Sequence, residues 1–241
     1  MKKVIELNTK IFADGADKQG MLQMYQKSWV KGFTTNPTLM RKAGIADYQA
    51  FALDILKDIP DRPISFEVFS DDFDEMYEQA LQIASWGNTV YVKIPVMNTK
   101  ADHSYSLIRS LAAKKVKMNV TALMTLDQVY DVAEALSGAP SSYISVFAGR
   151  IADTGRDPLP IMQKSLELMR PYPQLELIWA SPRELLNIFQ ADDLGCHIIT
   201  VTNDILKKLE FVGKDLTEFS LETVRMFRDD AVKAGFTLVT A

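Results

Sequence analysis

The sequence predicts a single-domain α/β protein whose eight parallel strands close into a (β/α)8 barrel, the TIM-barrel fold. Short apolar segments alternate with longer amphipathic segments about eight times, which is the pattern of parallel βαβ units. The chain has 241 residues, and eight such units fill about 200–250 residues in this fold. The alternative is an open doubly wound sheet, which usually carries a glycine-rich phosphate loop after its first strand. Neither G-x-G-x-x-G nor G-x-x-x-x-G-K-[ST] occurs in the sequence, and this favours the barrel.

Eight segments are predicted to be strands because they are short, apolar and rich in β-branched residues. In chain order they are Lys10–Asp14, Lys31–Thr35, Ile64–Phe69, Thr89–Pro95, Lys117–Ala122, Tyr143–Ala148, Leu175–Ala180 and His197–Thr202. The first of these is short, and Val4–Leu7 is an alternative candidate for the first strand.

The segments between the strands are amphipathic and predict the helices that cover the barrel. They are Gln19–Ser28, Asp47–Lys57, Asp74–Ser85, Ala101–Ala113, Thr125–Ser137, Pro158–Arg170, Arg183–Ala191 and Asn203–Leu209, and a last segment, Leu216–Ala234, follows them. No linker rich in Pro, Gly or Ser divides the chain. We therefore expect one domain over residues 1–241, with the barrel at about 10–209 and a C-terminal helical extension at about 210–241.

Charge and composition exclude several classes of function. The formal net charge is −4 and no long run of Lys or Arg occurs, so nucleic-acid binding is not expected. No stretch of about 18 apolar residues predicts a membrane span, and polar residues interrupt the N-terminal apolar stretch too early for a signal peptide. Cys196 is the only cysteine, which fits a reducing compartment. We expect a cytoplasmic protein that binds neither nucleic acid nor membranes.

Lys93 is the most informative residue because it lies within an apolar, β-branched run, Thr89–Val96. Burying an ammonium group costs several kcal/mol unless the charge is paired or neutralised. A buried lysine that loses its proton is an amine nucleophile and can form a Schiff base with a carbonyl substrate. The alternative is a lysine that is paired with a carboxylate inside the barrel, and the segment alone does not decide between the two.

The predicted strand ends carry polar side chains that would meet at one mouth of the barrel, where barrel enzymes hold their catalytic residues. In chain order they are Asp14, Thr34, Thr35, Asn36, Glu67, Lys93, Asn119, Thr121, Ser145, Arg150 in the turn after the sixth strand, Ser181 and Arg183. By strand alternation, Glu67 faces the interior with Ser65 and Phe69 and could lie within a few ångströms of Lys93. A carboxylate so close would favour the charged lysine, unless Thr121 or a water lies between them and makes Glu67 a proton-transfer group.

Several of these residues also have simple structural interpretations. Asp14 could cap the next helix, and Asn36 with Pro37 could start one. Ser181 with Glu184 has the spacing of a capping box. Arg150 could pair on the surface with an acidic residue, either Asp153 or Asp157.

Five linked segments resemble the transaldolase family, which includes the small transaldolases and the fructose-6-phosphate aldolases. They are Gly32–Leu39, Val92–Pro95, Asn119–Thr121, Ile144–Arg150 and Ala180–Arg183, and the resemblance runs from about Lys10 to about Leu209. It implies class I aldol chemistry in a (β/α)8 barrel that acts on small sugar phosphates, with no metal ion and no cofactor. Family members are oligomers of differing size, so the resemblance also implies a homo-oligomer.

The resemblance assigns a role to each matching residue. Lys93 matches the Schiff-base lysine, and Asp14 matches the aspartate that handles protons of substrate hydroxyls. Asn36 matches the asparagine that holds the dihydroxyacetone unit, and Thr121 and Glu67 match the pair that positions a catalytic water. The implied substrate-binding residues include Thr34 and Phe147, together with Asn119 and Ser145, which orient the intermediate. The implied phosphate-binding group is Arg150, Ser181 and Arg183. The helix after Ser181 would add main-chain amide donors to this group.

Two positions favour group transfer over simple cleavage. Glu67 and Phe147 resemble the transaldolases, whereas the fructose-6-phosphate aldolases carry glutamine and tyrosine there. The expected reaction joins sedoheptulose 7-phosphate and glyceraldehyde 3-phosphate to give erythrose 4-phosphate and fructose 6-phosphate. The alternatives are a lyase that releases free dihydroxyacetone, a family member acting on a variant anionic sugar, and an inactive barrel that binds a sugar phosphate as a sensor. The chain departs from the family at Gly15, where a threonine is usual, and at Pro182, where an aromatic is common.

Overall fold

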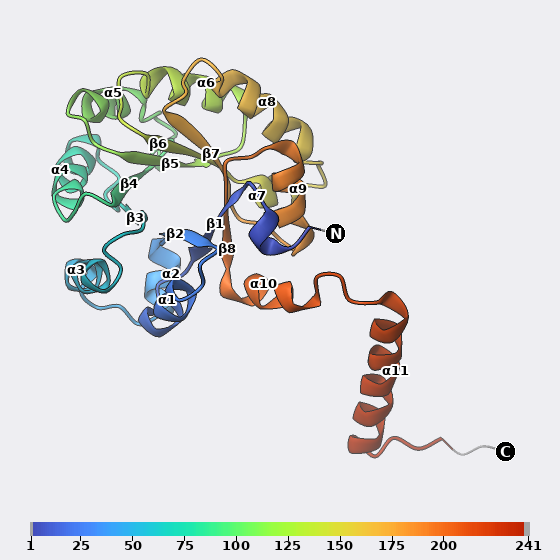
Figure 1. The fold of residues 1–241 in the computed structure, drawn as a ribbon. Coiled ribbons are helices and arrows are strands. Elements are labelled where there is room, and N and C mark those ends of the chain that lie inside the picture. The colour runs from blue at the N-terminus through green and yellow to red at the C-terminus, as the bar shows by residue number, and fades with distance from the viewer. Residues whose placement is uncertain (1, 239–241) are drawn as a thin grey trace.

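The computed structural model, which describes residues 2–238, contains a closed barrel of eight parallel strands in chain order (Figure 1). The strands are β1 (Lys10–Asp14), β2 (Val30–Thr34), β3 (Ile64–Glu67), β4 (Val90–Pro95), β5 (Met118–Leu123), β6 (Ser142–Val146), β7 (Leu175–Trp179) and β8 (Ile198–Thr202). Each strand pairs with the next, and β1 also pairs with β8, which closes the barrel. The predicted fold class is confirmed.

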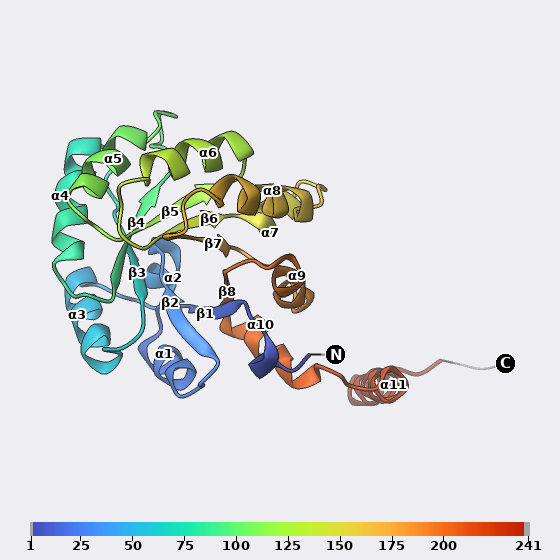
Figure 2. The ribbon, with the colours of Figure 1, turned by 45° about the horizontal axis from the view of Figure 1, so that its top comes forward.

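Helices surround the barrel on its outer face (Figures 1 and 2). The longer ones are α1 (Lys18–Tyr25), α3 (Tyr48–Asp58), α4 (Phe73–Ala84), α5 (Tyr105–Ala113), α6 (Leu126–Ala135), α8 (Leu159–Met169) and α9 (Leu186–Leu194). Three short helices, α2 (Pro37–Lys42), α7 (Ala148–Ala152) and α10 (Asn203–Lys207), follow directly on strand ends. Two 3-10 turns, Val4–Glu6 and Lys208–Phe211, precede the barrel and follow α10, and α11 (Leu216–Lys233) ends the described chain.

The structure corrects several predicted boundaries. Val4–Glu6 is a 3-10 turn, so Lys10–Asp14 is the first strand. The short helices α2 and α7 were absent from the predicted set, since one or two turns carry too little periodicity to show. The helix predicted from Ala101 begins only at Tyr105, because Ala101 has a φ of 66° and a left-handed residue cannot continue a right-handed helix.

Two separate apolar layers hold the barrel together. A large core lies between the strands and the surrounding helices and includes Ile64, Val92 and Leu177. A smaller cluster contains Phe12, Tyr91, Tyr143, Ile178, Ala180 and Ile198, with Phe147 packed against it. Tyr91 stacks on Tyr143 with ring centroids 4.0 Å apart, and Phe12 meets Tyr143 edge-on at 5.8 Å. Tyr91 and Tyr143 lie two residues before Lys93 and Ser145 on their strands, so the aromatic rings form a floor one layer below the polar residues.

The segment before β1 is fixed against α9. Asp192, buried at the edge of that helix, accepts hydrogen bonds from the main-chain N–H groups of Asn8 and Thr9 at 2.6 and 3.0 Å. Its other carboxylate oxygen pairs with Lys2 at 2.6 Å. These contacts hold the N-terminal residues on the barrel although no regular strand or helix contains them.

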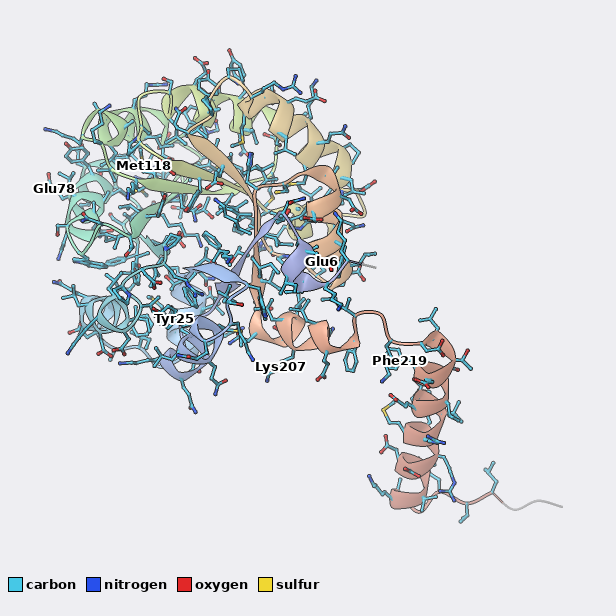
Figure 3. All side chains as sticks on the ribbon, in the orientation of Figure 1. Glu6, Tyr25, Glu78, Met118, Lys207 and Phe219 are labelled. Atoms are coloured by element: carbon cyan, nitrogen blue, oxygen red, sulfur yellow. The ribbon has the colours of Figure 1, made fainter. Side chains whose placement is uncertain are left out.

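Helix α11 differs from the other helices because it projects away from the barrel (Figures 1 and 2). Met118 lies among packed strands and helices, whereas Phe219 lies on α11, at a distance from them (Figure 3). No residue of α11 is buried, and its exposed apolar side chains include Leu216, Val224 and Phe227. Among the described residues, none of the helices combines the length and the apolar character that crossing a membrane requires.

Gly32 on β2 provides a test of how tightly the barrel interior is packed. A Cβ atom at this position would lie 2.6–2.8 Å from atoms of the Phe12 ring. Replacing Gly32 with alanine therefore overpacks the interior and should lower the free energy of unfolding by about 1–3 kcal/mol. Urea denaturation of Gly32→Ala measures this loss. Gly138→Ala is the control, because a Cβ there meets no atom within 4 Å, and equal stability of the two variants would contradict the prediction.

Candidate active site

Lys93 points into the barrel from β4 and is only 6% exposed. Its Nζ donates a hydrogen bond to the main-chain oxygen of Thr35 at 2.9 Å and lies 3.5 Å from Oε2 of Glu67. Strand register causes this pairing, since Glu67 on β3 lies opposite Lys93 on β4. The amine is thus held from one side by a neutral oxygen and from the other by a carboxylate.

Two buried carboxylates accompany this lysine. Burial raises the pKa of Glu67 above its ordinary value, while the charge of Lys93 and its hydrogen bond oppose the rise. Burial likewise raises the pKa of Asp14, and both Lys93 and a hydrogen bond from Thr34 oppose it. The charge of Asp14 adds to the rise in the pKa of Glu67. Both groups therefore accept a proton more readily than an exposed carboxylate does.

Asn119 on β5 lies opposite Lys93 in the strand register and is completely buried. Its Nδ2 donates to Oγ of Ser65 at 3.0 Å, and its Oδ1 accepts from Oγ of Ser145 at 2.7 Å. Because both ends of the amide are satisfied, this chain of three side chains on β3, β5 and β6 fixes the direction in which Ser145 points. Ser65 was predicted to face the barrel interior, but it was not among the predicted site residues.

Thr121, two residues after Asn119 on the same strand, has a buried hydroxyl with no hydrogen-bond partner among the described residues. The side chain lines the same cavity as Lys93. A buried hydroxyl without a partner is costly, so Thr121 has the chemistry to hold a water or a substrate oxygen beside the lysine.

Asn36 begins α2, as the structural interpretation predicted. Its Oδ1 accepts a hydrogen bond from the main-chain N–H of Leu39 at 2.9 Å, and Pro37 follows at the first helical position. The same residue also lines the cavity. Capping uses the oxygen, so the amide group remains able to donate to a ligand.

Arg183 is held by Asp153 on the rim. Its Nε donates to Oδ1 of Asp153 at 2.8 Å, and its Nη2 donates to Oδ2. Hydrogen bonding to Arg183 lowers the pKa of Asp153, burial opposes this effect, and the charges of Arg183 and Arg150 add to the lowering. The surface pairing considered for Arg150 is therefore made by Arg183 instead, and within residues 2–238 Arg150 forms no ion pair.

Gly149 allows the two arginines to come together. A Cβ atom on Gly149 would lie 1.6 Å from the main-chain oxygen of Ser181 and 3.3 Å from Nε of Arg183. Only glycine permits this approach of the segment after β6 to the segment after β7. Gly149 lies in the segment Ile144–Arg150 that resembles the family, and this close approach is the structural reason for a glycine at that position.

The predicted capping box of Ser181 and Glu184 is wrong. Ser181 has a left-handed φ of 60°, and α9 begins only at Leu186. The main-chain N–H groups of Arg183 and Glu184 instead donate to Oδ1 of Asn187 at 2.8 and 3.1 Å. The main-chain amides of Arg183 and Glu184, which were expected to be free donors, are therefore engaged. The side chains of Ser181 and Arg183 supply the polar groups of the rim instead.

These residues surround a cavity of about 800 Å³ at the carboxyl end of the barrel. Its lining contains the predicted residues Asp14, Thr34, Asn36, Glu67, Lys93, Thr121, Ser145, Phe147, Arg150, Ser181 and Arg183. Asn119 lies beneath it and acts on it through Ser145. The lining also contains Thr200, Thr202 and Asp204, which the sequence analysis missed. Thr200 and Thr202 are the polar positions of an otherwise apolar strand, and that alternation was the available signal.

Fold and cavity together define a (β/α)8 barrel protein with a polar, lysine-containing site at the carboxyl end of its strands. Solved structures agree on the fold. Dihydrodipicolinate synthase from Rhodopseudomonas palustris matches 92% of this chain and 80% of its own with a TM-score of 0.57 at 12% identity. A 2,3-dimethylmalate lyase matches 98% of this chain and 87% of its own with a TM-score of 0.55 at 12% identity.

Sequence comparison identifies the family. Residues 11–238 match the family described as Transaldolase/Fructose-6-phosphate aldolase, and the chain belongs to it. A protein of Thermoanaerobacter sp. named "Probable transaldolase" is 32% identical over 230 residues, 95% of this chain and all of its own length. A protein of the same name from Dehalococcoides mccartyi is 32% identical over 83% of this chain and 89% of its own.

Asp14 should reduce stability in return for its place in the cavity. Its folded-state pKa is raised from 3.8, so its contribution to stability is complete below 3.8 and is lost as pH rises through the folded value. The side-chain amide of Asp14→Asn does not ionise, so this variant does not lose stability as the pH rises. The variant should unfold at higher urea concentration than the wild type at neutral pH, and the difference should shrink as pH falls from the raised folded-state pKa toward 3.8 and vanish below it.

Urea melts across this pH range measure the effect. Asp193→Asn, at an exposed position next to the same barrel, is the control and should show no such trend. If the stability of Asp14→Asn relative to the wild type were lower at neutral pH than in acid, burial could not be the dominant cause of the raised pKa of Asp14.

Proposed function

We propose that the protein is a transaldolase, which transfers a dihydroxyacetone unit from a ketose phosphate to an aldose phosphate through a Schiff base on Lys93. The observation that carries the proposal is the buried Lys93 amine at the bottom of the cavity, 3.5 Å from Glu67 and within the field of Asp14. Membership of the Transaldolase/Fructose-6-phosphate aldolase family supports it.

Proton transfer within the cavity would create the nucleophile. Lys93 gives up a proton to one of the two buried carboxylates, whose raised pKa values favour acceptance. The neutral amine adds to the ketose carbonyl, and loss of water leaves an iminium ion. This ion draws electrons from the neighbouring carbon-carbon bond, so cleavage releases an aldehyde and leaves an enamine rather than a free carbanion.

Cleavage also requires removal of a proton from the hydroxyl at the bond that breaks. Thr121 and Glu67 would hold a water that takes this proton, consistent with the unpartnered hydroxyl of Thr121. Asp14 would exchange protons with another hydroxyl of the donor. Asn36 would hold the dihydroxyacetone unit. Thr34, which donates to Asp14, and Ser145, which Asn119 fixes, would orient the intermediate. Phe147 would form the apolar wall that packs on the floor cluster.

The rim would bind the phosphate group far from the reacting carbons. Arg150 has no ion pair within residues 2–238, and Arg183 keeps Nη1 available beside Ser181. Two guanidinium groups can grip one phosphate, and binding energy gained there orients the substrate for cleavage. The proposed reaction is sedoheptulose 7-phosphate with glyceraldehyde 3-phosphate to give erythrose 4-phosphate and fructose 6-phosphate.

Borohydride trapping tests the nucleophile. Incubation of the wild type with fructose 6-phosphate and borohydride should leave a dihydroxyacetone-derived adduct on Lys93, which peptide mass spectrometry locates. Lys93→Ala should lose the adduct and lower kcat by about 10³-fold or more, since the covalent route is removed. Lys31→Ala, at an exposed position of β2, is the control. An adduct elsewhere, or full activity of Lys93→Ala, would refute the mechanism.

Transfer and simple cleavage are separated by the fate of the three-carbon unit. With sedoheptulose 7-phosphate as the donor and no acceptor aldehyde, a transaldolase should release little free dihydroxyacetone, and adding glyceraldehyde 3-phosphate should start turnover to erythrose 4-phosphate and fructose 6-phosphate. An enzymatic assay for dihydroxyacetone, run with and without acceptor, measures this. Rapid release with the donor alone would instead establish the lyase.

We also propose that the protein acts in the cytoplasm as a homo-oligomer and that α11 forms part of the contact between copies. The support is that α11 leaves the barrel without burying a residue, although Phe227 and Val224 are 64% and 60% exposed. Apolar surface of this kind on a projecting helix gains stability when a second surface covers it. A second copy of the chain is available in every solution of the protein.

Light scattering coupled to size-exclusion chromatography tests the role of α11. The full chain should elute as an oligomer, and Phe227→Asp should shift the population toward monomer because a charge cannot be buried there without cost. Arg228→Asp changes the adjacent, more exposed position and is the control. A monomeric wild type, or an oligomer unaffected by Phe227→Asp, would contradict the proposal.

A further inference from the structure

Two threonine hydroxyls connect to Asp14 from the strands on either side of it. β1 pairs with β2 and with β8, so Asp14 lies opposite Thr34 on one side and opposite Thr202 on the other, with Thr200 two residues earlier on β8, opposite Phe12. Oγ1 of Thr34 donates to Oδ1 of Asp14 at 2.7 Å. Oγ1 of Thr34 and Oγ1 of Thr200 are themselves 2.5 Å apart. The three side chains form a continuous chain across the barrel, and both ends of it line the cavity.

The number of protons in this chain fixes its direction. Each hydroxyl has one hydrogen to donate, whereas an ionised carboxylate can only accept. When Thr34 donates to Asp14, it has no second hydrogen for Thr200. Thr200 must then donate to Thr34, and both hydroxyl dipoles point toward the carboxylate. This arrangement stabilises the ionised form of Asp14.

The surroundings make the chain effective. Thr34 is 2% exposed and Thr200 is 7% exposed, so neither hydrogen bond competes strongly with solvent, and aligned hydrogen bonds strengthen one another in a low dielectric. The charged and titratable groups that face the same cavity from other elements are Lys93 and Glu67 and, nearer its mouth, Lys42, Arg150, Arg183 and Asp204. Lys93 and Glu67 set the charge around Asp14, while the threonines supply neutral dipoles that do not titrate.

We propose that Thr200 is a positioning residue that, through Thr34, controls the protonation of Asp14 and changes its hydrogen-bond direction when Asp14 takes up a proton. The inference rests on the proposed function, in which Asp14 exchanges a proton with a donor hydroxyl. A proton on Oδ1 makes Asp14 a donor to Thr34. Thr34 then turns its hydrogen to Thr200, and the hydrogen of Thr200 turns into the cavity toward a substrate oxygen. The proton count is unchanged, because the hydroxyls rotate and the one added proton stays on Asp14.

Titration of Asp14 tests this directly and does not require activity. Protein labelled with ¹³C at the aspartate carboxyl carbon reports each carboxyl by NMR, and Asp14→Asn identifies the signal. Thr200→Val keeps the shape of the side chain but removes the hydroxyl, so the titration midpoint of Asp14 should rise. Losing about one weak hydrogen bond from the chain should change the ionisation constant of Asp14 by roughly 2- to 5-fold.

Two variants separate the hydroxyl from general effects on the cavity. Thr200→Ser keeps the donor and should restore the wild-type midpoint. Thr202→Val changes a cavity-lining threonine whose hydroxyl makes no capping bond, and it should leave the midpoint in place. An unchanged midpoint in Thr200→Val, a failure of Thr200→Ser to restore it, or an equal shift in Thr202→Val would overturn the proposal.

The kinetic profile links the chain to catalysis. Between the wild type and Thr200→Val, the acid limb of the plot of kcat/KM against pH should shift by the same amount as the NMR titration midpoint of Asp14. If no adduct forms on Lys93 in the wild type, the proposed function fails, while the NMR titration still decides the role of Thr200. If the adduct forms and the midpoint does not move, the role of Thr200 fails alone.

Discussion

The site depends on one constraint, which is that a lysine amine and two carboxylates share the interior of a closed barrel. Closure removes water from around Lys93, and strand register places Glu67 opposite it. Charges this close in a weakly polarisable interior interact far more strongly than on the surface. A lone ammonium would be too costly at this depth, and a lone carboxylate would be neutral. The group of three is tolerated because each member offsets the charge of another.

The layers of the barrel position this group. Phe12, Tyr91 and Tyr143 fill the interior below the polar residues, and Gly32 leaves the space that the Phe12 ring occupies. The aromatic floor lies one layer below Lys93, and the cavity is lined by residues at and after the carboxyl ends of the strands. The amide of Asn119 ties three strands together just above the floor. Packing therefore holds the polar side chains in place, and the segments after the strands contribute mainly the rim.

The strands and most of the site could be predicted because both follow from alternation within short segments. Asp14, Glu67, Lys93 and Thr121 lie at or near the carboxyl ends of β1, β3, β4 and β5, and a barrel brings such ends together whatever the details of its helices. What could not be predicted depends on contacts between distant segments. The pairing of Arg183 with Asp153, the left-handed Ser181 and the link from Thr34 to Thr200 each join residues whose approach is set by the barrel as a whole. A local motif, such as the apparent capping box at Ser181, misleads where the chain is held by close packing at Gly149.

The same burial explains why Glu67 need not silence Lys93. In water, a carboxylate beside an ammonium only reinforces its charge. In the barrel, burial raises the pKa of both Glu67 and Asp14, so either carboxylate accepts a proton from the ammonium more readily than an exposed carboxylate would. In the proposed mechanism, the neutral amine then meets the ketose carbonyl, and the iminium that follows restores a positive charge between carboxylates that can ionise again. The free energy that the fold loses by burying Asp14 and Glu67 would then be recovered as charge develops on the substrate.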